Sequence, residues 1–185
     1  MSIEHASRIL LAAAIVLVAA VACEPTPSEP ESSADPVAAP LFDRQLSPQV
    51  VQQLAKLRRY SAPLHNLERA EEAGFDVLIT DCRENPGVGG MGYHYANLSR
   101  IDGAPPTLLE PEILVFAPRR NGSLGLGAVE YIIPFGLWTE AAPPTLFGET
   151  FRANNVDGVW QLHVWLWKHN PAGLFEDWNP RVSCG

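Results

Sequence analysis

The stretch EILVFAPRRNGSLGLGAVEYII (residues 112–133) decides the fold. It contains two apolar runs, 112–117 and 127–133, separated by a turn-forming segment that includes Asn121-Gly122. An Asn-Gly pair between two apolar runs is typical of a β-hairpin. Further strand-like runs precede and follow it: FDVLIT (75–80), YHYAN (93–97) and VWQLHVWLW (159–167). We therefore expect a mainly antiparallel sheet of about five strands.

A helical segment precedes these strands. Ser47-Pro48 is typical of a helix start, because a hydroxyl can cap the first turn and proline fits the first helical position. Apolar residues at helical spacing continue to about Tyr60, Pro63 interrupts them, and a second short pattern ends at Gly74. Helices followed by consecutive strands indicate an α+β fold, with the N-terminal helical segment packed on the sheet.

The N-terminal end predicts export. Residues 1–22 contain an apolar run that is too short to span a bilayer comfortably and is typical of a signal peptide. The run ends in Ala-Val-Ala before Cys23, which is similar to the lipidation signal of bacterial lipoproteins. An ordinary signal peptide with an incidental cysteine is the alternative. Segment 23–40, rich in Pro, Ser and Glu, predicts a disordered tether, and 41–185 a single globular domain. We expect a lipid-anchored protein of the cell envelope, periplasmic or on the outer surface, with the bilayer as a partner.

Composition agrees with a folded domain and makes one class of partner unexpected. The chain has 185 residues, of which 46% are hydrophobic and 18% charged, and its formal net charge is −8. Lysines and arginines are scattered along the sequence without a basic patch. Because nucleic-acid binding needs concentrated positive charge, we do not expect a nucleic-acid partner.

The cysteine count predicts a covalent link. If Cys23 is lipidated or removed, Cys82 and Cys184 remain, and an even pair in an exported domain is expected to form a disulfide. Two free thiols or thiolate ligands are the alternative. Neither cysteine belongs to a CxxC pair, so nothing favours a redox or zinc-ribbon motif.

Three residues from three predicted strands are candidate metal ligands: His94, Glu130 and His163. Glu130 lies in an otherwise apolar strand, where a carboxylate needs a cation, a metal or solvent, because burying it alone is very unfavourable. If the strands place all three side chains on one face of the sheet, two imidazoles and one carboxylate suit zinc, iron or copper with an open coordination position. A metal-free polar pocket and purely structural roles remain alternatives.

The aromatic residues around these positions are candidates for the wall of a small-molecule pocket. His163, Trp165, Trp167 and His169 alternate in sequence, and Tyr95 follows His94. Large aromatic side chains with a polar group often line such pockets, although packing in the core explains the tryptophans equally well. We place His169 at a strand end, because Asn170-Pro171 follows it.

A glycine pattern near His94 has a competing interpretation. Gly87-x-Gly89-x-x-Gly92 formally matches the dinucleotide-binding fingerprint, but that fingerprint needs a following helix, and Tyr93 begins a strand-like segment. The pattern predicts a tight turn where the backbone can approach a neighbour closely.

Several motifs together resemble a family of bacterial secreted proteins and lipoproteins without an established activity. They are GMGYHYAN (90–97), PEILVF (111–116), VEY (129–131), PPTLFGETF (143–151) and HVWLWKHNPAGLFEDWNPRVSC (163–184). The resemblance implies that the histidines, the Glu130 strand and Cys184 belong to one framework, and it transfers no catalytic residue.

Together these features predict an exported domain with a small-molecule or metal-binding pocket of unknown specificity. A bound metal could activate water for hydrolysis. The alternative is a non-enzymatic structural or interaction lipoprotein with an aromatic core and no ligand.

Overall fold

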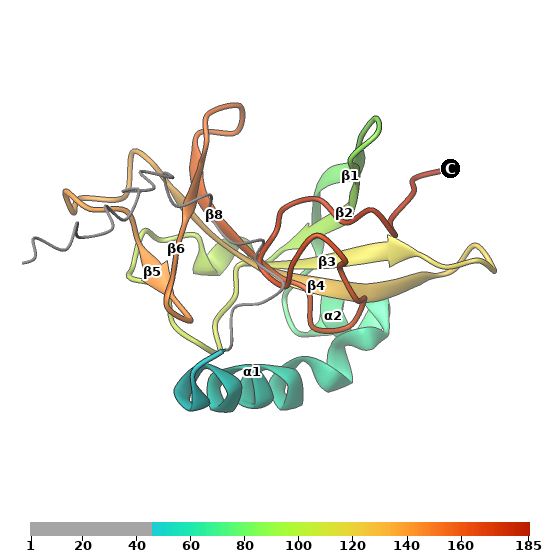
Figure 1. Cartoon of the computed structure of the whole chain (residues 1–185), viewed down its shortest axis with the longest axis horizontal. Helices are drawn as coiled ribbons and strands as arrows, with labels where there is room; N and C mark the ends of the chain where they lie inside the picture. The colour runs from blue at the N-terminus through green and yellow to red at the C-terminus, as the bar shows by residue number, and fades with distance from the viewer. Residues whose placement is uncertain (1–45) are drawn as a thin grey trace, which may run out of the picture. The chain divides into compact units, whose positions relative to one another are not determined.

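The computed structural model describes residues 46–185. The expected signal peptide, the lipidation of Cys23 and the tether to residue 40 lie outside the described residues. Figure 1 shows helices on one side of a strongly curved sheet, and the α+β prediction is confirmed. Among residues 46–185, no helix is both long and apolar enough to cross a membrane.

The helical segment begins as the sequence predicts. Helix α1 (Pro48–Ser61) is capped by Ser47, whose side chain accepts a hydrogen bond from the Val50 backbone N–H at 3.3 Å. The 3₁₀ turn η2 (Ala62–His65) contains the interrupting proline, and Asn66 caps helix α2 (Leu67–Glu72). Proline lacks the N–H that a continuous helix needs, which explains the break.

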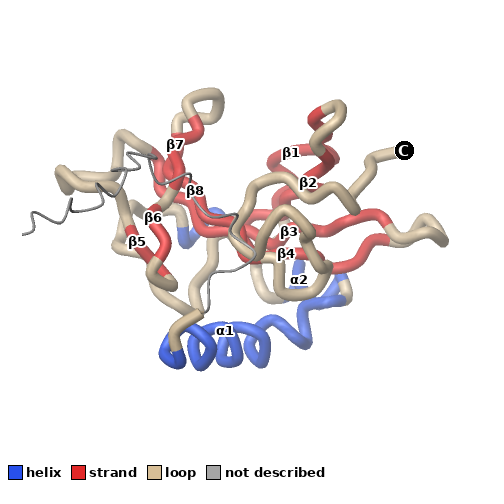
Figure 2. Tube along the Cα trace, viewed as in Figure 1, coloured by secondary structure: helices blue, strands red, loops and turns tan. Residues whose placement is uncertain are grey.

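The main sheet has six strands in the order β1-β2-β3-β4-β8-β7, and every neighbouring pair is antiparallel. Figure 2 shows these strands in red, together with a separate small hairpin of β5 and β6. A 3₁₀ turn, η3 (Leu98–Arg100), follows β2. The strands are β1 (Val77–Asn85), β2 (Gly89–Ala96), β3 (Ile113–Pro118), β4 (Leu124–Pro134), β5 (Thr145–Leu146), β6 (Glu149–Thr150), β7 (Arg152–Asn154) and β8 (Val159–Val164).

One face of the sheet packs against the helices. Side chains of β3, β4 and β8 alternate between the two faces, as strand geometry requires. The helix-covered face holds the larger apolar core, which joins residues of α1, η2 and α2 to the sheet. Its buried members include Leu57, Leu64, Ala70, Phe75, Leu114, Phe116, Val129, Tyr131, Leu162 and Val164.

The opposite face holds a smaller apolar cluster, and the C-terminal segment crosses it. The backbones of Gly90 and Asn179 exchange two hydrogen bonds, at 3.1 and 2.9 Å. A Cβ atom at Gly89, where φ is +138°, would lie 2.4 Å from the Asn179 carbonyl oxygen. Only glycine allows this approach, so the prediction that the glycine-rich turn permits close backbone contact is confirmed.

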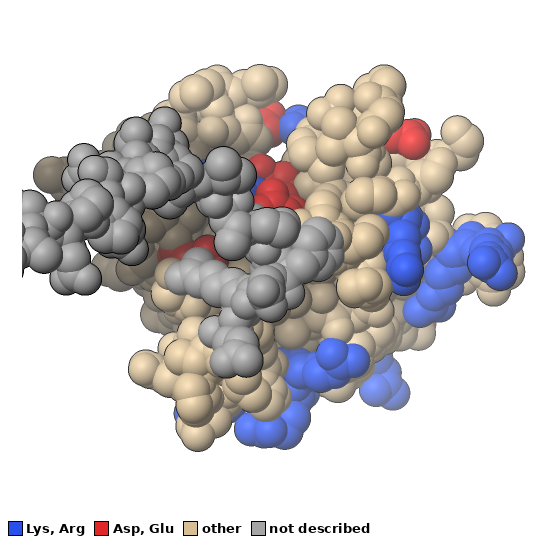
Figure 3. Space-filling model, viewed as in Figure 1, with Lys and Arg blue, Asp and Glu red and all other residues tan. Residues whose placement is uncertain are grey.

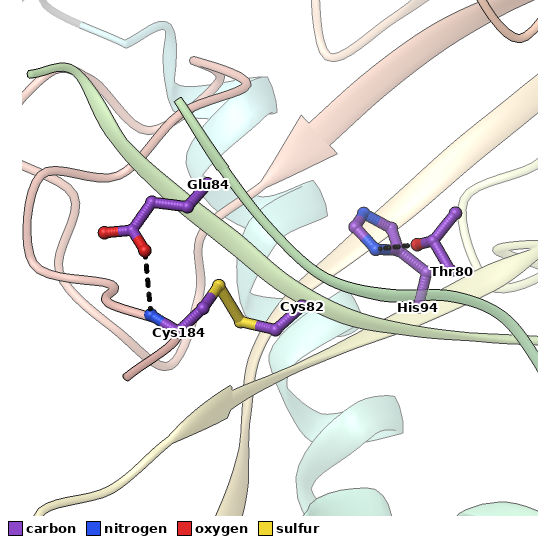
Figure 4. The surroundings of a disulfide bond; sticks show 5 residues. All are labelled: Thr80, Cys82, Glu84, His94 and Cys184. Carbon is purple, nitrogen blue, oxygen red and sulfur yellow. Dashed lines mark hydrogen bonds between the residues drawn. A yellow bond between two sulfur atoms is a disulfide. The ribbon is translucent and has the colours of Figure 1, made fainter. Parts of the chain in front are cut away.

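A disulfide ties the end of the chain to β1. The sulfur atoms of Cys82 and Cys184 lie 2.11 Å apart, across 102 residues of sequence, so the predicted pairing is confirmed. Figure 4 shows this link beside the Glu84 carboxylate, which accepts a hydrogen bond from the Cys184 backbone N–H at 3.4 Å. The disulfide and the Gly90–Asn179 pairing together hold the tail against β1 and β2.

The sequence interpretation that basic residues form no patch is wrong. Arg119, Arg120, Lys168 and Arg181 line one groove of about 930 Å³, and no acidic residue lines it. Figure 3 shows Lys and Arg side chains gathered at the end of the molecule where the β3–β4 hairpin projects. The hairpin and the tail bring together cations that are far apart in sequence. The expectation that nucleic acid is not a partner stays a prediction.

Candidate metal centre

His94, Glu130 and His163 meet on the face of the sheet opposite the helices. They come from β2, β4 and β8, and Glu130 lies directly opposite His163 in the antiparallel register. Their exposed fractions are 4%, 4% and 0%. The Nε2 atom of His94 lies 3.5 Å from Glu130 Oε2, and the Nε2 atom of His163 lies 3.6 Å from Glu130 Oε1. The structure therefore contains the predicted His–Glu–His cluster, with one possible ligand atom from each residue within 4.8 Å of the others.

The spacing of these atoms suits a metal ion. Two ligand atoms about 2.1 Å from a tetrahedral zinc ion lie about 3.4 Å apart. The two nitrogen–oxygen distances are each close to that separation, 3.5 Å from His94 to Glu130 Oε2 and 3.6 Å from His163 to Glu130 Oε1, so they end at different oxygens of one carboxylate. Small side-chain movements would therefore bring both imidazoles and the carboxylate to bonding distance of one ion.

Each imidazole has a side-chain oxygen close to its other nitrogen. The Thr80 hydroxyl and His94 Nδ1 lie 2.6 Å apart, as Figure 4 shows, and the Asp177 carboxylate lies 3.3 Å from His163 Nδ1. Metal-binding histidines usually donate their second N–H to such an oxygen, which fixes the tautomer and orients the ring. With the proton on Nδ1 in both rings, each Nε2 carries a free lone pair within 3.6 Å of the Glu130 carboxylate.

Neither Thr80 nor Asp177 was among the sequence candidates. Thr80 was part of a predicted strand, but nothing in its spacing connected it with His94. Asp177 lies in the C-terminal motif, and its contact with His163 depends on the path of the tail across the sheet. The predicted disulfide places the tail near β1, yet it does not determine which tail residue reaches the histidine.

The centre contains polar atoms that lack hydrogen bonds. Among the described residues, four buried side-chain atoms have no hydrogen-bond partner: Glu130 Oε2, Asp177 Oδ1 and both ring nitrogens of His163. An unsatisfied buried polar group typically costs about 1–3 kcal/mol, and more when it is charged. Within residues 46–185, all four of these atoms lie around Glu130 and His163.

Burial controls the ionisation of the cluster. It lowers the pKa of His94 to about 3, so this imidazole is neutral, which is the form that binds a metal. Burial also raises the pKa of Glu130. At His163, burial acts to lower the pKa, but the neighbouring Glu130 and Asp177 carboxylates outweigh it and the pKa is raised. The two histidines therefore have different proton affinities, although both face the same carboxylate.

His94 and Glu130 line a cavity of about 240 Å³, and His163 lies behind them outside its lining. At the rim of this cavity, the Arg83 guanidinium forms two hydrogen bonds with the Asp157 carboxylate, at 2.5 and 2.9 Å. This ion pair connects β1 at one edge of the sheet to the turn between β7 and β8 at the other. The lining consists of Ile79, Thr80, Arg83, Met91, His94, Ile113, Glu130, Ile132, Asn154, Asp157, Val159 and Gln161.

The aromatic residues proposed as pocket walls do not line this cavity. Trp165 stacks on the far side of His163, with ring centroids 6.3 Å apart, and its indole N–H donates to the Glu176 carbonyl. Trp167 lies against α1, where its indole N–H donates to the Ser61 hydroxyl at 3.0 Å. Tyr95 packs on Phe116 in the helix-covered core, and His169 is exposed.

The predicted strand 159–167 is longer than the observed strand β8. This explains why Trp165 and Trp167 do not lie where the sequence predicts. Strand β8 ends at Val164, because the next backbone groups bond outside its ladder. The Trp165 N–H donates to the Leu174 carbonyl and the Trp167 N–H to the Gly127 carbonyl. Alternate residues after His163 therefore do not lie on one face of a strand.

No family model, curated protein or solved structure matches the chain. The resemblance to secreted bacterial proteins stays a prediction, and the function of this centre has to be inferred from its chemistry.

Proposed function

We propose that the protein is an exported, lipid-anchored domain that binds one divalent transition-metal ion through His94 Nε2, a Glu130 oxygen and His163 Nε2. The observation that carries the proposal is the group of buried polar atoms without hydrogen bonds around Glu130 and His163. A cation bound among them would satisfy Glu130 Oε2 and His163 Nε2 directly. It would also hold His163 in the tautomer that donates to Asp177.

Zinc, iron and copper all accept two imidazoles and a carboxylate. We use zinc as the test ion, because each nitrogen–oxygen distance is compatible with tetrahedral coordination. Three protein ligands leave at least one coordination position open, and two of the three, His94 and Glu130, line the cavity of about 240 Å³. We therefore propose a site that binds a small molecule at the metal, or activates a bound water there, rather than a closed structural zinc site.

Export is the proposed setting of this site. The signal-like residues 1–22 and the position of Cys23 support it, and the disulfide of the folded domain suits an oxidising compartment. Mass spectrometry of the mature N-terminus tests the anchor, because a diacylated or triacylated Cys23 is the expected product. An unmodified cysteine, or a chain still starting at Met1, would contradict it.

Metal content is the decisive measurement. The full chain, purified without added chelator and incubated with zinc, is expected to retain about one equivalent after dialysis and to melt at a lower temperature when chelator is added. We expect His94→Asn and His163→Asn to abolish retention. His169→Asn is the matched control, because His169 is exposed and lies outside the cluster.

A different result would favour the structural alternative. If the wild-type chain retains less than about a tenth of an equivalent of zinc, iron and copper, and chelator leaves its melting unchanged, the histidines only stabilise the fold. In that case the two asparagine variants would lose stability without any metal-dependent change.

The neighbour of His163 provides a finer test. Asp177→Asn removes the carboxylate that faces His163 Nδ1, and losses of such partners typically lower metal affinity by about 10- to 100-fold. Asp81→Asn is the control, because Asp81 is exposed on β1. Equal zinc affinity in both variants would show that Asp177 does not orient the ligand.

A further inference from the structure

We infer that the ligand completing the metal's coordination is a small monoanionic carboxylate with a short apolar body. This inference rests on the proposed metal site. It follows from three properties of the cavity: the charge at its base, the state of its polar side chains and the nature of its wall.

Charge at the base favours an anion. A divalent ion bound by one carboxylate and two neutral imidazoles has a net charge of +1. Among the described residues, the only carboxylate besides Glu130 that lines the cavity is Asp157, which is paired with Arg83. Asp177 lies outside the cavity on the Nδ1 side of His163. It shares Arg152 with Glu176. An uncompensated charge in a buried site is unfavourable, so an anionic oxygen donor is preferred at the open position.

The polar side chains of the cavity are bonded to one another. Thr80 pairs with His94, and Arg83 pairs with Asp157. The Asn154 side-chain amide donates to the Asp157 carboxylate and to the side-chain Oε1 of Gln161, each at 2.8 Å. A ligand with many hydroxyl groups, such as a sugar, would find its hydrogen-bonding partners already engaged. An unpaired buried hydroxyl is unfavourable, so a single polar head group fits best.

The apolar lining and the volume of the cavity indicate the kind and length of the rest of the ligand. Its apolar lining residues are Ile79, Met91, Ile113, Ile132 and Val159. The volume of about 240 Å³ equals roughly eight water molecules at about 30 Å³ each. A carboxylate with a chain of about two to five further carbon atoms would fill this space with its alkyl group against the apolar wall.

Binding of straight-chain carboxylates to the cobalt(II)-loaded full chain tests this inference. Visible absorption of the bound cobalt reports coordination directly. We expect acetate, propanoate, butanoate and pentanoate to change the spectrum, with affinity increasing about fourfold for each methylene, as apolar burial predicts. The compound 3,4-dihydroxybutanoate should bind about tenfold more weakly than butanoate, and butanamide should leave the spectrum unchanged.

A pair of neighbouring strand residues provides the variant and its control. Ile79 lines the cavity and Leu78 does not, yet their exposed fractions are similar, at 41% and 44%. Both substitutions to asparagine should therefore fold. We expect Ile79→Asn to halve the gain per methylene, whereas Leu78→Asn should keep the fourfold gain.

The outcomes separate this inference from the proposed function. If cobalt and zinc do not bind, the metal site itself is wrong. If the metal binds but carboxylates cause no spectral change, or their affinity is independent of chain length, the ligand class is wrong. Equal affinity of butanoate for the metal-free chain would also overturn it, because the carboxylate would then bind elsewhere.

Discussion

The two faces of the central sheet are built by the same strands but have opposite chemical character. The helix-covered face holds the larger apolar core, and its buried polar groups are hydrogen-bonded: the Tyr131 hydroxyl donates to the Leu108 carbonyl at 2.7 Å and the Ser61 hydroxyl to the Leu57 carbonyl at 2.9 Å. On the opposite face, Glu130 and His163 place unpartnered polar atoms in the interior. Because Glu130 and Tyr131 are adjacent in β4, a single residue step separates a satisfied core from an unsatisfied site. The apolar core on the first face stabilises the fold. The buried ionisable groups on the second face lower the stability of the metal-free protein.

The largest effect is expected on the helix-covered face. Phe116→Ala removes a fully buried ring from the larger core and should lower the free energy of unfolding by about 3–5 kcal/mol. Zinc affinity of the folded protein should stay within about threefold. Urea unfolding and zinc titration measure the two quantities. Val156→Ala, at a residue that is 90% exposed, is the control and should change stability by less than about 0.5 kcal/mol. A large loss of zinc affinity in Phe116→Ala would contradict the separation of the two faces.

The second-largest effect on stability is expected from removing the disulfide that holds the tail against β1 and β2. Replacing Cys82 and Cys184 by serine should lower the free energy of unfolding by about 2–5 kcal/mol, because the bond closes a long loop. Zinc affinity should also fall, since the tail carries Asp177. Thermal unfolding of the variant should match that of the wild-type chain in reducing agent. A difference below about 1 kcal/mol would mean that the backbone contacts of the tail suffice without the covalent bond.

Removing the ionisable cluster should raise the free energy of unfolding, whereas the two preceding changes lower it. In the metal-free chain, replacing His94, Glu130 and His163 together by leucine should raise the free energy of unfolding by about 1–4 kcal/mol, because buried ionisable and unsatisfied polar groups are exchanged for apolar ones. Metal-dependent stabilisation should disappear. His169→Leu is the control at an exposed histidine. If the triple variant is less stable than the metal-free wild type, the cluster contributes to the fold and the contrast between the faces is weaker.

The smallest effect concerns a buried carboxyl next to β3. Burial raises the pKa of Glu112 to about 8 from 4.5, while the hydrogen bond from the Ile132 N–H acts in the opposite direction. The unfolded chain loses this proton near pH 4.5, and the folded chain keeps it until about pH 8. Stability should therefore decrease as pH rises through this window.

Glu112→Gln should remove that decrease, a difference of about 1–3 kcal/mol between pH 5 and pH 8. Urea unfolding at the two pH values measures it. Glu110→Gln, in the same loop but exposed, should retain the pH dependence of the wild type. Identical pH profiles for wild type and Glu112→Gln would show that Glu112 is ionised in the folded state.

Local patterns predicted much of the fold and part of the site. The Asn-Gly turn, the Ser-Pro helix start and the alternating apolar residues each depend on a few neighbouring positions, and the corresponding elements are present. Glu130 stood out because a carboxylate in an apolar strand needs a partner. Asp177 could not be found in this way, because its contact with His163 depends on how the tail returns. Trp165 and Trp167 do not line the cavity, because β8 ends at Val164, where the tail and β4 supply new backbone partners.

The sequence by itself determined the order of helices and strands, the face of each strand that is apolar, and the pair of cysteines available for a disulfide. These properties follow from local periodicity and residue chemistry. Only the tertiary structure decided that Glu130 lies opposite His163, that Asp177 reaches the same histidine, and that Arg83 and Asp157 close the rim across the sheet. Strand register, sheet curvature and the path of the tail arise from contacts between residues far apart in the chain. The free energies of those contacts are shared by the whole fold, so no short segment contains them.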